Sequence, residues 1–460
     1  MKKSGIILVL ALIAGQISFA QEKKDGIEKY MRSSLYTIIL DDHGLMDGHN
    51  AEIIKNTFFE TPLPEKFNDH NLSREYRTFD PARYEVTDAE VAAVTGKSQE
   101  GKKKGGIGKG IGKFAKKTAS NASAGVIDTT DTSKLPAKFI KYFKDKQIAN
   151  QMVARWYNLG SYDPETQSYF DMELIKERGL YSASEFDKNI ADKSTRGLAM
   201  LADAGENLIN NTFIVGIRFN YVSKEDMAKQ LASTTSAVTG LIGGKAAALT
   251  NTVVQAGSAV AGKGYVIKAT AFLYQLDWND EASNKFYTEY YNASDLADFA
   301  HTDDFNLKYV GSETAWADIQ SSVFSKSSED QLVERATVRA IDNVIAKLQK
   351  KFEAFRTKTP LVTTDPEITA HIGMKEDLEG GDKYEVLEKI QDPETGIVTY
   401  KRVAVIKVDK NKIWDNRYAA DVEQAENAAN NAGEVQSITA TSFTGSNKNI
   451  YPGMLIRQID

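Results

Sequence analysis

Two long runs of alternating apolar side chains constrain the fold of this 460-residue chain more than any other feature. Residues 211–222 (NTFIVGIRFNYV) place an aromatic or β-branched side chain at every second position, and residues 264–278 (GYVIKATAFLYQLDW) predict a second strand of the same kind. A period of two sends neighbouring side chains to opposite faces of a sheet, so Lys268 should face one way and Ile267 and Ala269 the other. The chain must therefore build a sheet, and other elements must cover its apolar face.

The patterns around these runs place helices beside the sheet. We expect further strands at 34–40 and 73–79, helices at 50–60, 135–159 and 329–355, a glycine-interrupted helix at 196–209, and a strand, a turn and a helix over 169–191. In the helix at 329–355, Val344 and Leu348 belong to a buried stripe, Ser328 and Gln331 form a capping box at its start, and the Thr-Pro pair at 359–360 stops it. The chain should therefore adopt an α+β fold whose core has sandwich-like α/β layers.

The last hundred residues change to short strands. Residues 382–390 and 397–410 lie on either side of the turn sequence DPETG and predict a hairpin, and residues 435–443 and 450–459 predict two more strands. Several short strands with turn signals between them favour a small β-barrel or sandwich over residues 360–460.

Residues 97–134 differ in composition from the rest of the chain. The stretch from Lys97 to Lys117 contains eight lysines and one glutamate, and glycines are frequent. Each glycine costs a helix roughly 1 kcal/mol relative to alanine, so we expect an exposed, mobile insertion. The alternative is a segment that lies on a membrane or glycan surface, because its apolar side chains share one helical face and "GIGKF" resembles the start of magainin-type membrane-active peptides. The residues that would bind such a surface are Lys102, Lys103, Lys104, Ile107, Lys109, Ile111, Lys113 and Phe114.

A second insertion, residues 223–263, is low in charge and rich in Ala, Gly, Ser and Thr. We expect a surface flap, and the alternative is a small-residue helix pair that enters a bilayer in an oligomer. The expected divisions of the chain are a leader at 1–20, the first part of the α/β core at 21–96, the insertion at 97–134, the rest of the core at 135–358 with its insertion at 223–263, and the small barrel at 360–460.

The chain begins with the pattern of a secretory leader. Lys2 and Lys3 precede an apolar run of about ten residues, and Ser18 and Ala20 are the small side chains expected before cleavage at Gln21. Such a run is shorter than the roughly 20 residues of a membrane span. Without the two leader lysines the formal net charge changes from −6 to −8, which argues against a general nucleic-acid binder. The chain has no cysteine, so the exported protein would depend on packing without disulfides.

A polar cluster at residues 38–52 (IILDDHGLMDGHNAE) raises the question of a metal site. Asp41, His43, Asp47 and His49 could bind a metal ion if the loop folded on itself. We favour a strand-to-helix turn, because short polar side chains cap helix starts, negative charge suits the positive helix end, and no His-Glu-x-x-His spacing occurs.

Other catalytic patterns are weaker. The sequence VTGKS ends like a phosphate-binding loop, but Val91 stands where that motif needs glycine. His70, His301 and His371 each stand apart along the chain and suggest no nucleophile–base pair. We therefore expect no catalytic residue and no cofactor.

Two parts of the chain resemble known envelope proteins. Residues 172–186 followed by 201–219 resemble the pattern of CsgG-type curli-secretion proteins, without the lipoprotein cysteine of the curli channel. The C-terminal part is similar to the SH3-like domain of flagellar assembly protein T. The first resemblance is carried by Glu177, Arg178 and Leu180, and the second by Gly381, Asp382, Val386, Asp392, Thr395, Gly396 and Gly453. These resemblances imply an α/β domain, a long helix and a C-terminal SH3-like β-barrel, and the "FAQ" end of the leader resembles secreted proteins of the Bacteroidetes type.

These observations predict an exported, non-enzymatic envelope protein of the periplasm or outer membrane that binds, scaffolds or assembles other components. Its expected partners are other envelope proteins or a membrane or cell-wall surface, with a homo-oligomer as an option, and not nucleic acid. Two alternatives stay open. One is a membrane-inserting oligomer that uses 97–134 and 223–263, and the other is a metal-dependent hydrolase at the cluster from Asp41 to His49.

Overall fold

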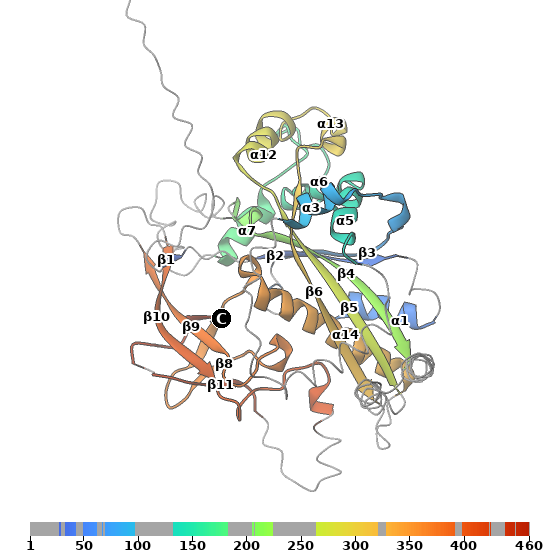
Figure 1. Cartoon of the computed structure of the whole chain (residues 1–460). Helices are drawn as coiled ribbons and strands as arrows, with labels where there is room; N and C mark the ends of the chain where they lie inside the picture. Colours follow the sequence, from blue (N-terminus) through green and yellow to red (C-terminus); the bar gives the residue numbers. More distant parts are fainter. Residues whose placement is uncertain are drawn as a thin grey trace, which may run out of the picture.

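A computed structural model describes residues 27–28, 33–42, 49–61, 67, 70–96, 132–182, 205–206, 208–223, 264–320, 328–391, 398–422, 424, 438–446 and 448–459. These residues form two β-sheets and the helices that cover them (Figure 1). The fold is therefore mixed α+β, which confirms the predicted class.

The first sheet has five strands in the order β3-β2-β4-β5-β6. The strands are β2 (Ser34–Asp41), β3 (Asn71–Thr78), β4 (Thr212–Ser223), β5 (Gly264–Leu276) and β6 (Leu307–Gln320). β2 pairs in parallel with both β3 and β4, whereas β4, β5 and β6 are antiparallel. Four of the strands confirm sequence predictions. The sequence analysis missed β6, whose middle holds Gly311, Ser312 and Glu313 in place of an apolar alternation.

Helices cover both faces of this sheet (Figure 1). α1 (His49–Glu60) and α14 (Glu329–Lys351) pack on the face that presents Leu35, Ile267 and Ala269. α5 (Leu135–Asp145) and α6 (Ile148–Trp156) pack on the opposite face against Tyr36 and Ile38. The predicted alternation along β5 is therefore confirmed, and the alternating strand residues supply two separate cores.

Two helix predictions were wrong in their boundaries. The region 135–159 forms two helices, because Gln147 takes a left-handed conformation (φ 51°) and breaks the run. α14 starts at the predicted Ser328–Gln331 capping box but ends at Lys351, before the predicted stop. Phe352 has an extended backbone and ends the helix. Its ring packs against Gly311 of β6, where a Cβ atom would lie only 2.0 Å from the ring.

The prediction for residues 169–191 was also wrong. α7 (Glu173–Ser182) runs through the expected turn, and residues after Ser182 lie outside the described part. Its Arg178 is buried, donates through Nη2 to the Asn71 carbonyl at 3.1 Å and lies 5.2 Å from the centroid of the Trp156 ring. This anchor holds the helix against β3 and α6. Of the helix predicted at 196–209, the structure describes 205–206 and 208–209, which are helical.

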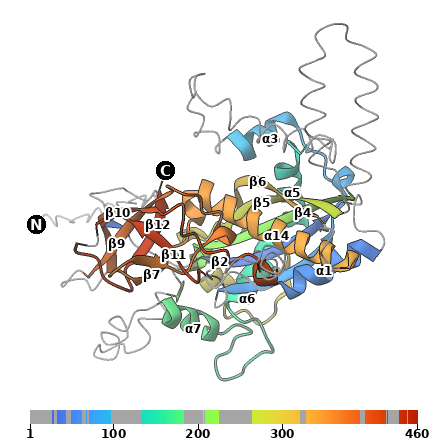
Figure 2. The ribbon, with the colours of Figure 1, turned by 90° about the horizontal axis from the view of Figure 1, so that it is seen from below.

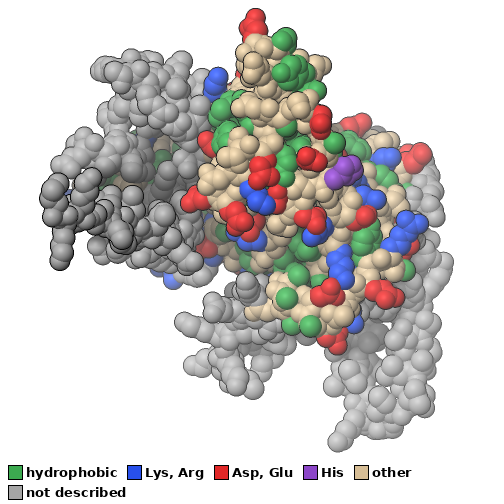
Figure 3. Space-filling view, turned by 90° about the horizontal axis from the view of Figure 1, so that it is seen from above, with side chains coloured by type: hydrophobic (Ala, Val, Ile, Leu, Met, Phe, Trp, Pro, Cys, Tyr) green, Lys and Arg blue, Asp and Glu red, His purple; other side chains and the backbone are tan. Residues whose placement is uncertain are grey.

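Between β5 and β6 the chain forms an aromatic lobe. It contains α12 (Asp280–Lys285), η3 (Phe286–Tyr290) and α13 (Ala297–His301), with α3 (Asp88–Thr95) lying beside α5 nearby. The rings of Tyr157 and Phe286 lie 4.2 Å apart and join the lobe to the end of α6. Figure 3 shows acidic side chains scattered over this upper face.

The second sheet has seven strands in the order β1-β10-β11-β8-β7-β12-β9, with an additional β9–β10 pairing. The strands are β1 (Ile27–Glu28), β7 (Thr359–Thr363), β8 (Ile368–Ala370), β9 (Lys383–Gln391), β10 (Val398–Val408), β11 (Thr441–Thr444) and β12 (Leu455–Ile459). The six strands from β7 to β12 pair only in the antiparallel sense. Their pairings run from β10 to β11, β8, β7, β12 and β9 and then return to β10. The predicted β9–β10 hairpin is confirmed, whereas its DPETG turn lies outside the described residues.

The second sheet encloses its own apolar core, which includes Val386, Ile406, Phe443 and Ile456. Figure 2 shows its strands grouped on one side of the five-stranded sheet, with α1 on the far side. The end of α14 meets this second sheet, so the long helix connects the two parts of the molecule.

Candidate functional site

The predicted Asp/His cluster begins at the carboxyl end of β2, which is a favourable place for a ligand. β2 is the middle one of the three parallel strands. The next strand along the chain, β3, lies on one side of β2, and the following strand, β4, lies on its other side. Open parallel sheets bind ligands at such a switch point. The position alone therefore keeps this end of the sheet as a candidate site.

The described carboxylates at this end are held by neighbouring strands. Arg218 on β4 donates through Nε to Asp42 Oδ2 at 2.5 Å, and the two side chains are only 5% and 7% exposed. On the other side, the Tyr76 hydroxyl of β3 donates to Asp41 Oδ2. The two acids thus link β2 to β4 and to β3, and a metal would have to compete with these bonds.

The start of α1 is joined to the same region. Asn50 Nδ2 donates to the Tyr221 hydroxyl of β4 at 2.7 Å. The described side-chain bonds of Asp42 and Asn50 therefore hold the turn to β4. His43 and Asp47 lie outside the described residues, and of His49 only the backbone is described. Among the side chains that the structure describes, no three His, Asp or Glu groups are placed to hold a metal ion.

His70 stands apart from the other histidines along the chain, but in the fold it contacts a serine and lies near an arginine. Its Nδ1 lies 3.5 Å from Ser34 Oγ, and Arg178 Nη1 donates to the same oxygen at 3.5 Å. Ser34 and His70 are fully buried, so no substrate can reach this contact from solvent. The cluster joins the start of β2 to α7 and to the residue before β3.

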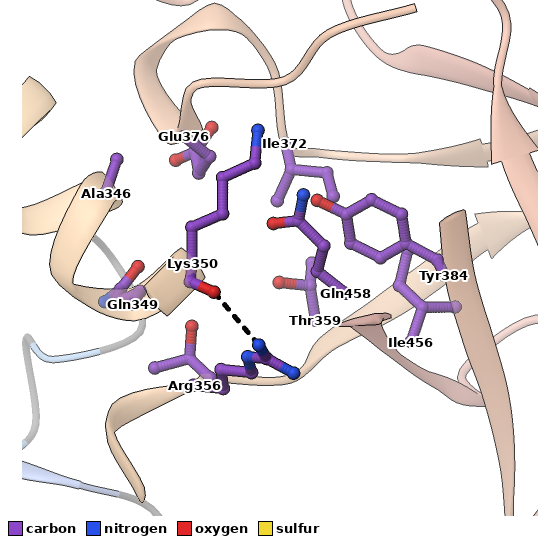
Figure 4. Close-up of a pocket in the computed structure, with 11 residues that line it drawn as sticks. Ala346, Gln349, Lys350, Arg356, Thr359, Ile372, Glu376, Tyr384, Ile456 and Gln458 are labelled. Atoms are coloured by element: carbon purple, nitrogen blue, oxygen red, sulfur yellow. Dashed lines mark hydrogen bonds between the residues drawn. The ribbon is translucent and has the colours of Figure 1, made fainter. Parts of the chain in front are cut away.

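The second candidate site is a cleft between the end of α14 and the seven-stranded sheet (Figure 4). It holds roughly 400 Å³ of space, counting the part open to solvent. The residues that line it are Ala346, Gln349, Lys350, Arg356, Thr357, Thr359, Ile372, Glu376, Tyr384, Ile456 and Gln458. The cleft therefore combines an apolar wall with charged and amide groups, as ligand sites commonly do.

Asp382 fastens the helix to the sheet beside this cleft. Lys350 Nζ lies 3.1 Å from Asp382 Oδ2, and Gln458 Nε2 donates to the same oxygen at 3.1 Å. Lys350 Nζ also donates to the Asp377 carbonyl at 3.1 Å, and burial raises the pKa of the Asp377 carboxyl. Asp382 and the left-handed Gly381 before it (φ 92°) were part of the sequence resemblance, so the sequence did mark this corner.

Tyr384 on β9 supplies the most distinctive group of the cleft. Its ring packs edge-on against Phe443 in the sheet core at 5.4 Å, and the residue is only 6% exposed. Its hydroxyl points into the cleft (Figure 4) and has no hydrogen-bond partner among the described residues. Burial raises the pKa of Tyr384, and the carboxylates of Asp382 and Glu376 raise it further. The hydroxyl therefore stays protonated, and it can both donate and accept a hydrogen bond at the lining.

Two charged groups mark different parts of the cleft lining. Arg356 donates through Nη2 to the Lys350 carbonyl at 3.1 Å (Figure 4), which fixes the guanidinium on the linker after α14. Glu376 accepts from Gly373 N at 2.7 Å and from Asn416 Nδ2 at 2.9 Å, which fixes the carboxylate. The sequence analysis singled out neither residue.

The predicted surface-binding residues from Lys102 to Phe114 lie outside the described part of the chain, as do residues 224–263. Among the helices that the structure describes, none is both long and apolar enough to span a bilayer. No protein-family model matches the chain, and no curated protein matches it either.

Proposed function

We propose that this chain is an exported, non-enzymatic protein of the cell envelope that binds or scaffolds other envelope components, and that it does so through the cleft beside α14. The hydroxyl of Tyr384 carries this proposal, because it points into a concave space that charged, amide and apolar groups line. A ligand that forms a hydrogen bond with this hydroxyl would gain binding energy there.

The acids at the end of β2 favour binding over catalysis as the function, because both are engaged in bonds between strands. Asp42 forms a buried ion pair with Arg218, and Asp41 accepts from Tyr76. A general base or metal ligand needs a carboxylate that can face a substrate or an ion, whereas these two hold strands together.

We also propose that residues 360–460 form an SH3-like barrel. The support is the run of antiparallel pairings that returns to β10, the apolar core inside it and the tight turn at Gly381. The leader pattern and the resemblance to CsgG-type and flagellar assembly proteins support export and an envelope role.

The test combines localisation with site-specific cross-linking. We expect the full chain to fractionate with the periplasm or outer membrane and to begin at Gln21, and a chain without residues 2–20 to stay in the cytoplasm. A photo-crosslinking amino acid at Met374, which is 38% exposed on the η5 turn (Met374–Glu376) beside the cleft, should give an adduct of defined mass. Phe59 on α1, 42% exposed, serves as the matched control. A cytoplasmic full chain, or equal labelling from both positions, would contradict the proposal.

A further inference from the structure

The cleft beside α14 has an acidic part. Three carboxylates, those of Asp382, Glu376 and Asp377, are close enough to Tyr384 to raise the pKa of its hydroxyl. Lys350 is shared between Asp382 at 3.1 Å and Asp377 at 3.8 Å, and Lys347 also lies near enough to Asp377 to oppose the rise in its pKa that burial causes. The three carboxylates still outnumber these two ammonium groups, so a ligand ammonium would be favoured here.

A cation lines the cleft away from these acids. In Figure 4, Arg356 and Glu376 lie on opposite sides of the space, with the Lys350 stem, Gln458 and Tyr384 between them. A guanidinium held at the lining attracts a carboxylate, because its charge does not change with pH and its planar shape matches the carboxylate group. The two sides of the cleft thus favour opposite charges on one ligand.

The middle of the cleft suits a small ligand with a short apolar side chain. Ile372, Ile456, Ala346 and the methylene stem of Lys350 provide apolar surface. Gln458 commits its Nε2 to Asp382, which leaves its side-chain oxygen as an acceptor at the lining. The space of roughly 400 Å³ includes open solvent, so the occupant must be small.

From this geometry we propose that the cleft binds a small zwitterion, a free α-amino acid or the two ends of a very short peptide. Its ammonium group faces Glu376 and the Tyr384 side of the cleft, and its carboxylate faces Arg356. This inference rests on the proposed binding function of the cleft and gives it a ligand class.

The test is ligand-observed NMR on the full mature chain with L-alanine as the probe. Propionate lacks the ammonium, isopropylamine lacks the carboxylate, and alanyl-alanine separates the free amino acid from a short peptide. We expect L-alanine or alanyl-alanine to bind and each single-charge probe to bind at least tenfold more weakly, since each loses one charge-assisted interaction. Propionate or isopropylamine binding as well as L-alanine, or no binding by either zwitterion, would overturn the proposal.

Variants assign the groups. Tyr384→Phe removes only the hydroxyl and should weaken zwitterion binding roughly tenfold, whereas Tyr418→Phe, whose hydroxyl bonds Glu334 away from the cleft, should leave it unchanged. Arg356→Gln should weaken binding of L-alanine and propionate but not of isopropylamine. Unchanged L-alanine binding by Tyr384→Phe would overturn the proposal even if the arginine variant did not fold. If no zwitterion binds but the protein is exported and cross-links at Met374, the ligand proposal is refuted and the proposed envelope function is not.

Discussion

Replacing Asp42 with alanine should destabilise the protein strongly, because it leaves a buried guanidinium without its counter-ion. The Arg218 and Asp42 side chains are 5% and 7% exposed, and their contact is a charge-assisted hydrogen bond of 2.5 Å. Removing one partner of a buried ion pair typically costs about 3–5 kcal/mol. Arg218 keeps its 2.8 Å bond to Asn220, so we expect about 3 kcal/mol, the lower end of that range.

The assay is urea unfolding followed by the fluorescence of the four tryptophans, compared at the wild-type midpoint. Asp277→Ala is the matched control, because Asp277 directly follows β5 of the same sheet and its 2.9 Å pair with Lys308 is 33% and 55% exposed, so it should contribute less than about 1 kcal/mol. The double variant Asp42→Ala/Arg218→Met should cost less than the sum of the two single changes, by about 1–3 kcal/mol.

Two outcomes would refute the reasoning. A cost below about 1 kcal/mol for Asp42→Ala would mean that the pair does not hold β2 to β4. Additive costs in the double variant would mean that the two side chains do not depend on each other. A cation that stabilises the wild type but not Asp42→Ala would instead favour the metal site that the sequence left open.

Three further changes test other parts of the fold. Gly311→Ala should cost about 1–3 kcal/mol in urea unfolding, because its Cβ would lie 2.0 Å from the Phe352 ring, whereas Gly96→Ala, with no atom within 4 Å, should be nearly neutral. Ser328→Ala removes the cap of α14 and should lower stability by about 1 kcal/mol, and restoring the cap as Ser328→Asp should recover most of it. Burial raises the pKa of Asp377 above 3.8, so the folded state binds its proton more tightly and stability should fall as pH rises above that value. Asp377→Asn should flatten this dependence in thermal unfolding between pH 4 and 7, and an unchanged slope would contradict the assignment.

The parts of the fold that the sequence predicted are those governed by local periodicity. β2, β4 and β5 bury both faces or alternate strictly, and the capping box at Ser328 is a local pattern of four residues. The errors arose where tertiary contacts override that pattern. Gly311 breaks the strand signal of β6 because Phe352 needs the space, and the buried anchor of Arg178 keeps α7 helical through an expected turn.

The candidate sites were harder to predict, because their residues come from distant parts of the chain. Asp42 and Arg218 are separated by 176 positions, and His70 meets Ser34 across 36. A single sequence shows the polar residues after β2 but not the arginine that neutralises one of them. The acids in this region were therefore noticed, whereas their strand-linking role became visible only in the fold.

The proposed binding cleft depends on how the seven-stranded sheet is joined to α14. Its lining combines the end of α14, the linker through Arg356 and three strands of the seven-stranded sheet, β7, β9 and β12. Asp382 holds these parts together through Lys350 and Gln458, which places Tyr384 against the helix end. A ligand that bridges Arg356 and Glu376 would contact both parts of the molecule, so its binding should raise the unfolding temperature of the whole chain. A ligand that bound the seven-stranded sheet alone would stabilise only that sheet, so a single rise in unfolding temperature for both sheets would support binding in the proposed cleft.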